Sequence, residues 1–174
     1  CTCKGALMTI KVNLNPNALS AAERDAKVAE GGFGKYYTDH MVVCDWDEKS
    51  GWGTPELIPY GPITLDPATA VFHYGQEIFE GMKAYSQPDG SISLFRPEAN
   101  AQRFARSAKR LALPEMPIEF FMDTVKELVK QDRNWVPQKV GESLYIRPFM
   151  FATEVGLGVR PTNKATYYLI CTPA

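Results

Sequence analysis

The middle of the chain carries apolar residues at helical spacing. One set falls at intervals of three and four residues, which places its side chains along a single face of a helix. These positions are Ile118, Phe121, Met122, Val125, Leu128 and Val129. Pro97 suits the first turn of a preceding helix, because its missing N–H needs no partner there. We therefore expect helices over residues 97–111 and 118–132.

The first of these helices has two distinct faces. The apolar positions that we expect to be buried are Phe104, Ala108 and Leu111. Arg103, Arg106 and Arg110 recur at intervals of three and four and share another face. Such a basic face usually meets solvent, and an anion site is the alternative.

Shorter stretches rich in β-branched and aromatic residues predict strands. They cover residues 36–46, 57–60, 70–74, 79–85, 91–95, 143–151 and 165–172. The turn sequence Pro88-Asp89-Gly90 indicates that the fourth and fifth form a hairpin. A short helix within residues 17–30 ends at a glycine-rich stretch. Because strands and the two main helices occur in separate blocks, the sequence predicts an α+β fold with a mostly antiparallel sheet.

Composition and charge exclude several classes of protein. The chain of 174 residues fits one domain, and its 45% hydrophobic residues are typical of a folded soluble domain. Its net charge is −1, so it lacks the basic excess of a nucleic-acid or membrane-surface binder. No apolar run approaches the ~20 residues of a membrane helix. The charge is unevenly divided, at −5 for residues 1–90 and +4 for residues 91–174.

Cysteine and histidine usage gives no metal site. Cys1 and Cys3 form a C-x-C pair, and the other two cysteines and both histidines are isolated in the sequence. Zinc sites need paired ligands at short spacing. Free thiols in a cytoplasmic protein are the simplest interpretation. Residues 1–7 precede Met8 and lack the pattern of a signal peptide, so we interpret them as a cloning remnant or a misassigned start.

Read without reference to any family, the residues give no catalytic motif, but they do place two side chains on one face of a strand. The sequence has no P-loop, G-x-G-x-x-G, G-x-S-x-G or H-E-x-x-H motif. Period-two alternation places Tyr145 and Arg147 on one face of a strand. A guanidinium flanked by Tyr145 and Phe149 needs a partner if it is buried. A ligand carboxylate or phosphate would supply one, and so would an internal salt bridge.

Several blocks of the sequence resemble the branched-chain amino acid aminotransferases. The blocks are Phe33-Gly34, Thr38-Asp39-His40-Met41, residues 73–85 with Phe79-Glu80-Gly81-Met82-Lys83, Leu94-Phe95-Arg96-Pro97, Asn100, Arg103, Arg106-Ser107-Ala108, Arg110-Leu111, Leu144-Tyr145-Ile146-Arg147-Pro148 and Leu157-Gly158-Val159. They occur in the family's order from about residue 33 to the end. The resemblance therefore covers most of the chain.

The resemblance implies a pyridoxal-phosphate enzyme of fold type IV, which exchanges amino groups between Leu, Ile or Val and 2-oxoglutarate. It implies that residues 8–174 are the N-terminal small domain, and that the large domain, which holds the Schiff-base lysine, is absent. We therefore expect this chain to be inactive alone, to act with that missing domain, and to form a homodimer when complete.

The resemblance also implies roles for individual residues. Arg103 matches the position that binds the cofactor phosphate, and Arg147 matches the residue that receives the glutamate side-chain carboxylate. The wall of the substrate pocket is matched by Phe33, Tyr74 and Tyr145, with Val159 at its edge. Lys83 is not the lysine that binds the cofactor, and Glu80 is interpreted as structural. No residue of the chain is assigned a catalytic role.

Two alternatives stay open beside this interpretation. A D-amino acid aminotransferase or an aminodeoxychorismate lyase would share the fold, although the Tyr145-x-Arg147 pair and residues 79–83 favour the branched-chain enzyme. A stand-alone binding or interaction module would instead use the face left by the large domain to recruit a partner.

Overall fold

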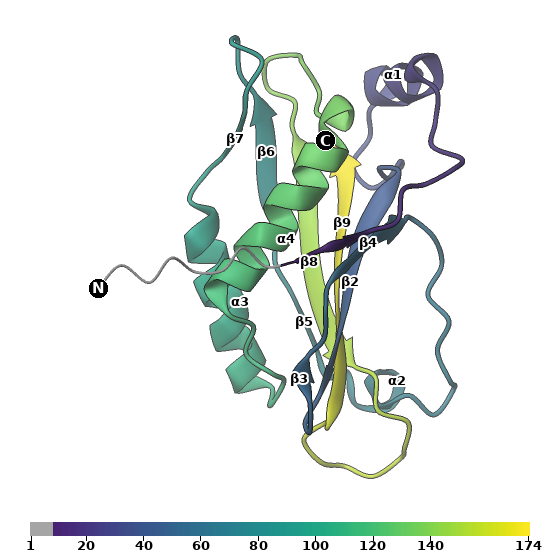
Figure 1. Cartoon of the computed structure of the whole chain (residues 1–174), viewed down its shortest axis with the longest axis vertical. Coiled ribbons are helices and arrows are strands. Elements are labelled where there is room, and N and C mark those ends of the chain that lie inside the picture. Colours follow the sequence, from purple (N-terminus) through teal and green to yellow (C-terminus); the bar gives the residue numbers. More distant parts are fainter. Residues whose placement is uncertain (1–8) are drawn as a thin grey trace.

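The computed structural model describes residues 9–174, which form one sheet with helices (Figure 1). The interpretation of residues 1–7 lies outside the described residues. The strands are β1 (Lys11–Val12), β2 (His40–Asp47), β3 (Gly51–Trp52), β4 (Glu56–Pro59), β5 (Glu77–Phe79), β6 (Met82–Ser86), β7 (Ile92–Leu94), β8 (Leu144–Ala152) and β9 (Lys164–Pro173). The helices are α1 (Ala21–Glu30), α2 (Ala70–Tyr74), α3 (Pro97–Arg110) and α4 (Ile118–Gln131), followed by a 3-10 turn at Arg133–Trp135.

The sheet is antiparallel at every pairing except one. Its strands follow the order β1-β4-β2-β9-β8-β6-β7, while β3 pairs with β2 and β5 pairs with β8. Only β1 and β4 run parallel among the described strands. The predicted α+β fold with a mostly antiparallel sheet is therefore confirmed.

Helices α3 and α4 lie against one face of the sheet, and the core fills the space between them (Figure 1). Phe104 of α3, Phe121 of α4 and Tyr167 of β9 pack with ring centroids 5.4–6.3 Å apart. The buried hydroxyl of Tyr167 shares a hydrogen bond of 3.1 Å with Thr124, so the phenol is not left unpaired. Leu111, which we expected to be buried, is 41% exposed because α3 ends at Arg110.

The predicted strand over residues 70–74 is wrong, because these residues form the short helix α2. An Asx turn precedes it, in which the Asp66 side chain accepts from the N–H of Ala68 at 2.7 Å. Gly75 ends the helix in the left-handed region at φ 57°, and its N–H donates to the Val71 carbonyl. Turn chemistry at both ends therefore overrides the β propensity of the apolar residues between them.

The predicted strand over residues 79–85 is interrupted, and its two parts are β5 and β6. Both pair with β8 in one continuous register, which places Glu80 opposite Pro148. The N–H of Glu80 donates to the Pro148 carbonyl at 2.9 Å, but a proline has no N–H to return. Because the register continues, Phe79 and Gly81 share the open face of the sheet with Arg147, and Glu80 faces the helices.

A buried hydrogen bond between His40 and Asp132 joins the start of β2 to the end of α4. His40 Nδ1 lies 2.6 Å from Asp132 Oδ1, and the two side chains are 5% and 2% exposed. The N–H of Asn15 donates to His40 Nε2 at 2.9 Å. Because Nε2 accepts this bond, the ring proton lies on Nδ1 and points to Asp132.

Candidate functional site

Tyr145 and Arg147 lie side by side on the open face of β8, as their spacing predicts. Arg147 Nη2 donates to the Tyr145 hydroxyl at 2.9 Å. The guanidinium carbon is 4.4 Å from the ring centroid of Phe79 and 5.3 Å from that of Tyr145. No carboxylate in residues 9–174 pairs with Arg147, and its Nε is buried without a hydrogen-bond partner there. A cation between two aromatic rings, with an unused donor, is suited to bind an anion.

Phe33 completes an aromatic corner with Tyr145. Their ring centroids are 4.9 Å apart and the planes meet at 85°, an edge-to-face contact. The segment that carries Phe33 is held on β9 by the Thr172 hydroxyl, which accepts from the N–H of Gly34 and donates to the Tyr36 carbonyl. The exposed ring of Phe33 therefore stands at the rim of the Tyr145–Arg147 site.

Gly81 lets the phenol of Tyr145 lie directly against the backbone of the neighbouring strand. A Cβ atom at position 81 would lie 2.2 Å from the Tyr145 hydroxyl oxygen and 2.9 Å from Cζ. These distances exclude a side chain at Gly81 while Tyr145 keeps its position. Lys83, two residues further along the chain, is exposed and lies opposite Tyr145 in the β6–β8 register.

Arg103 forms a two-point ion pair with Glu80. Arg103 Nε and Nη2 lie 2.6 Å and 2.7 Å from the two carboxylate oxygens, and Asn100 Nδ2 donates to the same group at 3.0 Å. The Glu80 side chain is 3% exposed and that of Arg103 is 60% exposed. Burial acts to raise the pKa of Glu80, but the bonds and charge of Arg103 and the bond from Asn100 bring it below its ordinary value. Glu80 is therefore ionised at neutral pH.

The basic face of α3 borders a groove of about 400 Å³ beside β5. Its lining includes Phe79, Arg103, Arg106 and Arg110. Within the described part of the chain, hydrogen bonds from Arg103 use only Nε and Nη2, so the Nη1 donors remain for another acceptor. The solvated face that the spacing predicts thus adjoins a concave surface with three guanidinium groups, which is favourable for an anion.

Tyr74 and Val159 lie away from this site. Tyr74 is the last residue of α2, and its hydroxyl donates to the Leu157 carbonyl in the loop after β8. The N–H of Ala70, at the start of α2, donates to the Glu154 carbonyl at 2.9 Å, which ties the helix to that loop. Val159 follows in the same loop and is 83% exposed.

The length of β8 separates these residues from the aromatic corner. Tyr145 is the second residue of the strand and Ala152 is its last. Seven residues at about 3.3 Å each correspond to roughly 23 Å. Within one chain, the structure therefore joins Phe33 to Tyr145 and does not bring Tyr74 or Val159 to them.

Two residues of the site were not assigned to it from the sequence. The ring of Phe79 lies under the Arg147 guanidinium, and the Glu80 carboxylate forms an ion pair with Arg103. The usable signal for Phe79 was alternation, because residues 79, 81 and 83 share a face of one predicted strand. Pairing of that strand with β8, more than 60 residues later, could not be deduced from the same pattern.

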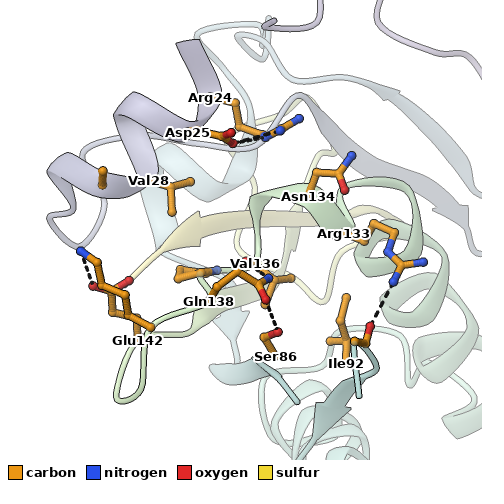
Figure 2. A pocket seen from close by; sticks show the side chains of 14 residues that line it. Arg24, Asp25, Val28, Ser86, Ile92, Arg133, Asn134, Val136, Gln138 and Glu142 are labelled. Carbon is orange, nitrogen blue, oxygen red and sulfur yellow. Dashed lines mark hydrogen bonds and ion pairs between the residues drawn. The ribbon is translucent and has the colours of Figure 1, made fainter. Parts of the chain in front are cut away.

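A cavity of about 500 Å³ lies elsewhere, between α1, the β6–β7 hairpin and the segment before β8 (Figure 2). Several of its polar side chains are paired with one another. Arg24 pairs with Asp25 at 2.9 Å, and Ser86 donates to Gln138 at 2.7 Å. The cavity contains none of the residues expected to bind substrate or cofactor.

Two other kinds of feature do not occur in residues 9–174. No helix there is both long and apolar enough to cross a membrane. No group of three or more His, Cys, Asp or Glu side chains there has the arrangement of a metal site.

Known proteins match the chain over most of its length. It is 53% identical over 171 residues to a probable branched-chain-amino-acid aminotransferase of Streptomyces coelicolor, covering 97% of this chain and 47% of that protein. It is 56% identical over 164 residues to the branched-chain-amino-acid aminotransferase of Mycolicibacterium smegmatis, covering 94% and 45%. The chain thus spans about half the length of these curated relatives.

The fold matches solved structures of the same group. A branched-chain amino acid aminotransferase from T.th., complexed with N-(5'-phosphopyridoxyl)-L-glutamate, aligns with a TM-score of 0.56 and 26% identity, over 74% of this chain and 40% of that one. These likenesses confirm the resemblance to branched-chain amino acid aminotransferases. The family model described as amino-transferase class IV matches residues 77–174, more than half of the chain. The chain therefore belongs to the class IV aminotransferase family.

Proposed function

We propose that this chain is the small domain of a pyridoxal-phosphate-dependent transaminase that exchanges amino groups between Leu, Ile or Val and 2-oxoglutarate. Identities of 53% and 56% to proteins named branched-chain aminotransferases support this assignment. In the proposal, the lysine that binds the cofactor lies in a large domain outside this chain, which spans about half the length of the matched relatives. The 174-residue chain would then supply the substrate pocket and a phosphate anchor without turnover of its own.

The placement of Arg147 is the observation that supports the proposal best. Such an enzyme must accept an aliphatic and an acidic side chain in one pocket. The rings of Phe33, Tyr145 and Phe79 offer apolar surface to a branched chain. The Arg147 guanidinium offers charge-assisted hydrogen bonds to the glutamate carboxylate.

Arg103 is proposed to bind the phosphate of the cofactor. Its exposed guanidinium in a groove with Arg106 and Arg110 has the donor chemistry that a phosphate needs. Pyridoxal phosphate, when bound, supplies the electron sink for amino transfer. The residues of this chain would hold its phosphate, orient the substrate carboxylate and exclude water with aromatic rings.

Tyr74 and Val159 remain proposed substrate contacts. Because each chain places them far from its own Tyr145, a homodimer is the arrangement in which they would reach a substrate, in the pocket of a second copy. A cytoplasmic location is also part of the proposal. Relatives in Saccharomyces cerevisiae carry the names cytosolic and mitochondrial, so the family name does not decide the compartment.

Single-turnover spectroscopy of the polypeptide expressed from the complete reading frame tests the proposal. With pyridoxal phosphate added, L-leucine, L-isoleucine, L-valine and L-glutamate should each convert the cofactor, and D-alanine should not. Conversion by D-alanine alone would favour a D-amino acid aminotransferase. Release of p-aminobenzoate from aminodeoxychorismate would favour the lyase. No reaction with any of these compounds would favour an interaction module.

A further inference from the structure

Glu80 and Gly81 are consecutive residues whose contacts lie on opposite faces of the sheet. Glu80 faces the helices and is bonded to Arg103 of α3. Gly81 faces the open side, where the phenol of Tyr145 rests against it. One peptide unit therefore lies between the Arg103 groove and the Tyr145–Arg147 site.

The Glu80 carboxylate orients the Arg103 guanidinium. Both carboxylate oxygens accept from Arg103, and their fork-to-fork geometry fixes the plane of the guanidinium. The Arg103 side chain is otherwise largely exposed and would sample many rotamers. Restricting these rotamers before an anion arrives lowers the entropy cost of binding it.

Asn100 is hydrogen-bonded to both Glu80 and Gly81. Its Nδ2 donates to Glu80 Oε2 at 3.0 Å and to the Gly81 carbonyl at 3.1 Å. Asn100 lies one turn before Arg103 on α3, so the same helix carries the clamp and the guanidinium. A shift of Asn100 or of Glu80 would therefore be transmitted to Arg103 and to the backbone that supports Tyr145.

We propose that Glu80, Gly81 and Asn100 form a bridge that couples the Arg103 anion site to the Tyr145–Arg147 site, with Glu80 and Asn100 as positioning residues. The inference rests on the proposed function for what each site binds, and on the contacts above for the coupling. It predicts that loss of the Asn100 donors disturbs both sites, although Asn100 touches neither Tyr145 nor Arg147 through a hydrogen bond.

Nitrogen-15 NMR of the arginine side chains in the 174-residue chain tests the bridge, with inorganic phosphate as the probe. The variants are Glu80→Gln and Asn100→Asp, which keep side-chain size. Glu80→Gln removes a charge, and Asn100→Asp removes two donors and adds a carboxylate beside Glu80. Glu127→Gln is the matched control, because Glu127 pairs with Lys130 at 3.7 Å on the exposed face of α4.

Both variants should increase the solvent exchange of the Arg103 Nε–H by about tenfold or more, as expected for the loss of a charge-assisted hydrogen bond. Phosphate binding at Arg103 should weaken. In Asn100→Asp the Arg147 Nε–H signal should also shift, a coupling that a purely local role would not produce. Glu127→Gln should leave all three measurements unchanged.

Any one of three results would overturn the bridge. The solvent exchange of the Arg103 Nε–H could be unchanged in both variants, or the Arg147 Nε–H signal could be unchanged in Asn100→Asp. The third is tighter phosphate binding in Glu80→Gln. The last would show that Glu80 competes with the anion for the guanidinium. If phosphate leaves the unsubstituted Arg103 signal unmoved, the proposed anchor role fails. The exchange at Arg103 and the response of Arg147 still decide the bridge in that case.

Discussion

The Arg147 guanidinium lies over the ring of Phe79, with 4.4 Å between the guanidinium carbon and the ring centroid. A guanidinium can stack an aromatic ring on its face and donate hydrogen bonds within its plane. The stack therefore leaves the N–H edge of Arg147 for a carboxylate and keeps apolar surface beside it. This arrangement explains how one site can offer contacts to both an acidic and an aliphatic side chain.

Replacing Arg147 by Gln should separate the two half-reactions of the proposed enzyme. In the product of the complete reading frame, kcat/KM for glutamate should fall by at least roughly tenfold, because a charged partner is lost from a partly desolvated site. The leucine half-reaction should change much less, since the branched chain makes apolar contacts. Single-turnover kinetics with each amino acid measures both, and Arg24→Gln, in the separate cavity of Figure 2, is the control. Equal losses for both substrates would mean that Arg147 has a structural role.

Gly81→Ala should displace Tyr145 without unfolding the chain. The new Cβ would lie 2.2 Å from the Tyr145 hydroxyl, so the phenol must move and its bond from Arg147 must break. The matched control is Gly61→Ala, where no atom lies within 4 Å of the added Cβ. NMR shifts of Tyr145 and Arg147 should change in the first variant and persist in the second. An unchanged Tyr145 signal in Gly81→Ala would contradict the close approach.

His40→Ala should destabilise the fold strongly. It removes the ring donor to the buried Asp132 carboxylate, which keeps the bond from the backbone N–H of residue 40, and it removes the acceptor for the Asn15 N–H. Leaving a buried donor or acceptor without its partner typically costs about 1–3 kcal/mol for each group. Urea unfolding measures the change in the free energy of unfolding. His73→Ala, at an exposed histidine, is the control and should change it by less than about 0.5 kcal/mol.

Local patterns predicted those parts of the fold that depend on local contacts. The apolar spacing from Ile118 to Val129 marks the buried face of α4, and alternation places Tyr145 and Arg147 together. The helix at residues 70–74 was missed because a turn before it and Gly75 after it decide its conformation. The break between β5 and β6 was missed because its cause, Pro148, lies on another strand.

The candidate site shows the same division between local and distant information. Spacing alone placed Arg147 beside Tyr145 and left a ligand anion and an internal salt bridge as alternatives, and the resemblance assigned binding roles to Arg147 and Arg103. The partner of each residue comes from a distant segment, Phe79 for Arg147 and Glu80 for Arg103. Register and helix packing bring these pairs together, and neither can be deduced from the periodicity of a single segment.

Glu80 should make the stability of the chain sensitive to acid. In the folded chain burial raises its pKa, but the bonds from Arg103 and Asn100 and the charge of Arg103 bring it below its ordinary value of 4.5. A carboxyl group with a lowered pKa contributes stability that is fully present above the unfolded pKa and is lost as the pH falls through the folded one. The unsubstituted chain should therefore lose its stability advantage over Glu80→Gln as the pH falls below about 4.5.

Urea unfolding of both chains at a series of pH values, between neutral and acid, measures this difference. At neutral pH the unsubstituted chain should be the more stable, because Glu80→Gln loses the charge that holds Arg103. The difference in the free energy of unfolding between the two chains should disappear on acidification, since protonated Glu80 no longer forms an ion pair. The free energy of unfolding of Glu127→Gln should follow that of the unsubstituted chain at every pH, because the ion pair of Glu127 with Lys130 lies at the surface and contributes little. A difference in the free energy of unfolding that stays constant across the acid range would show that Glu80 stabilises the fold through its shape and not through its charge.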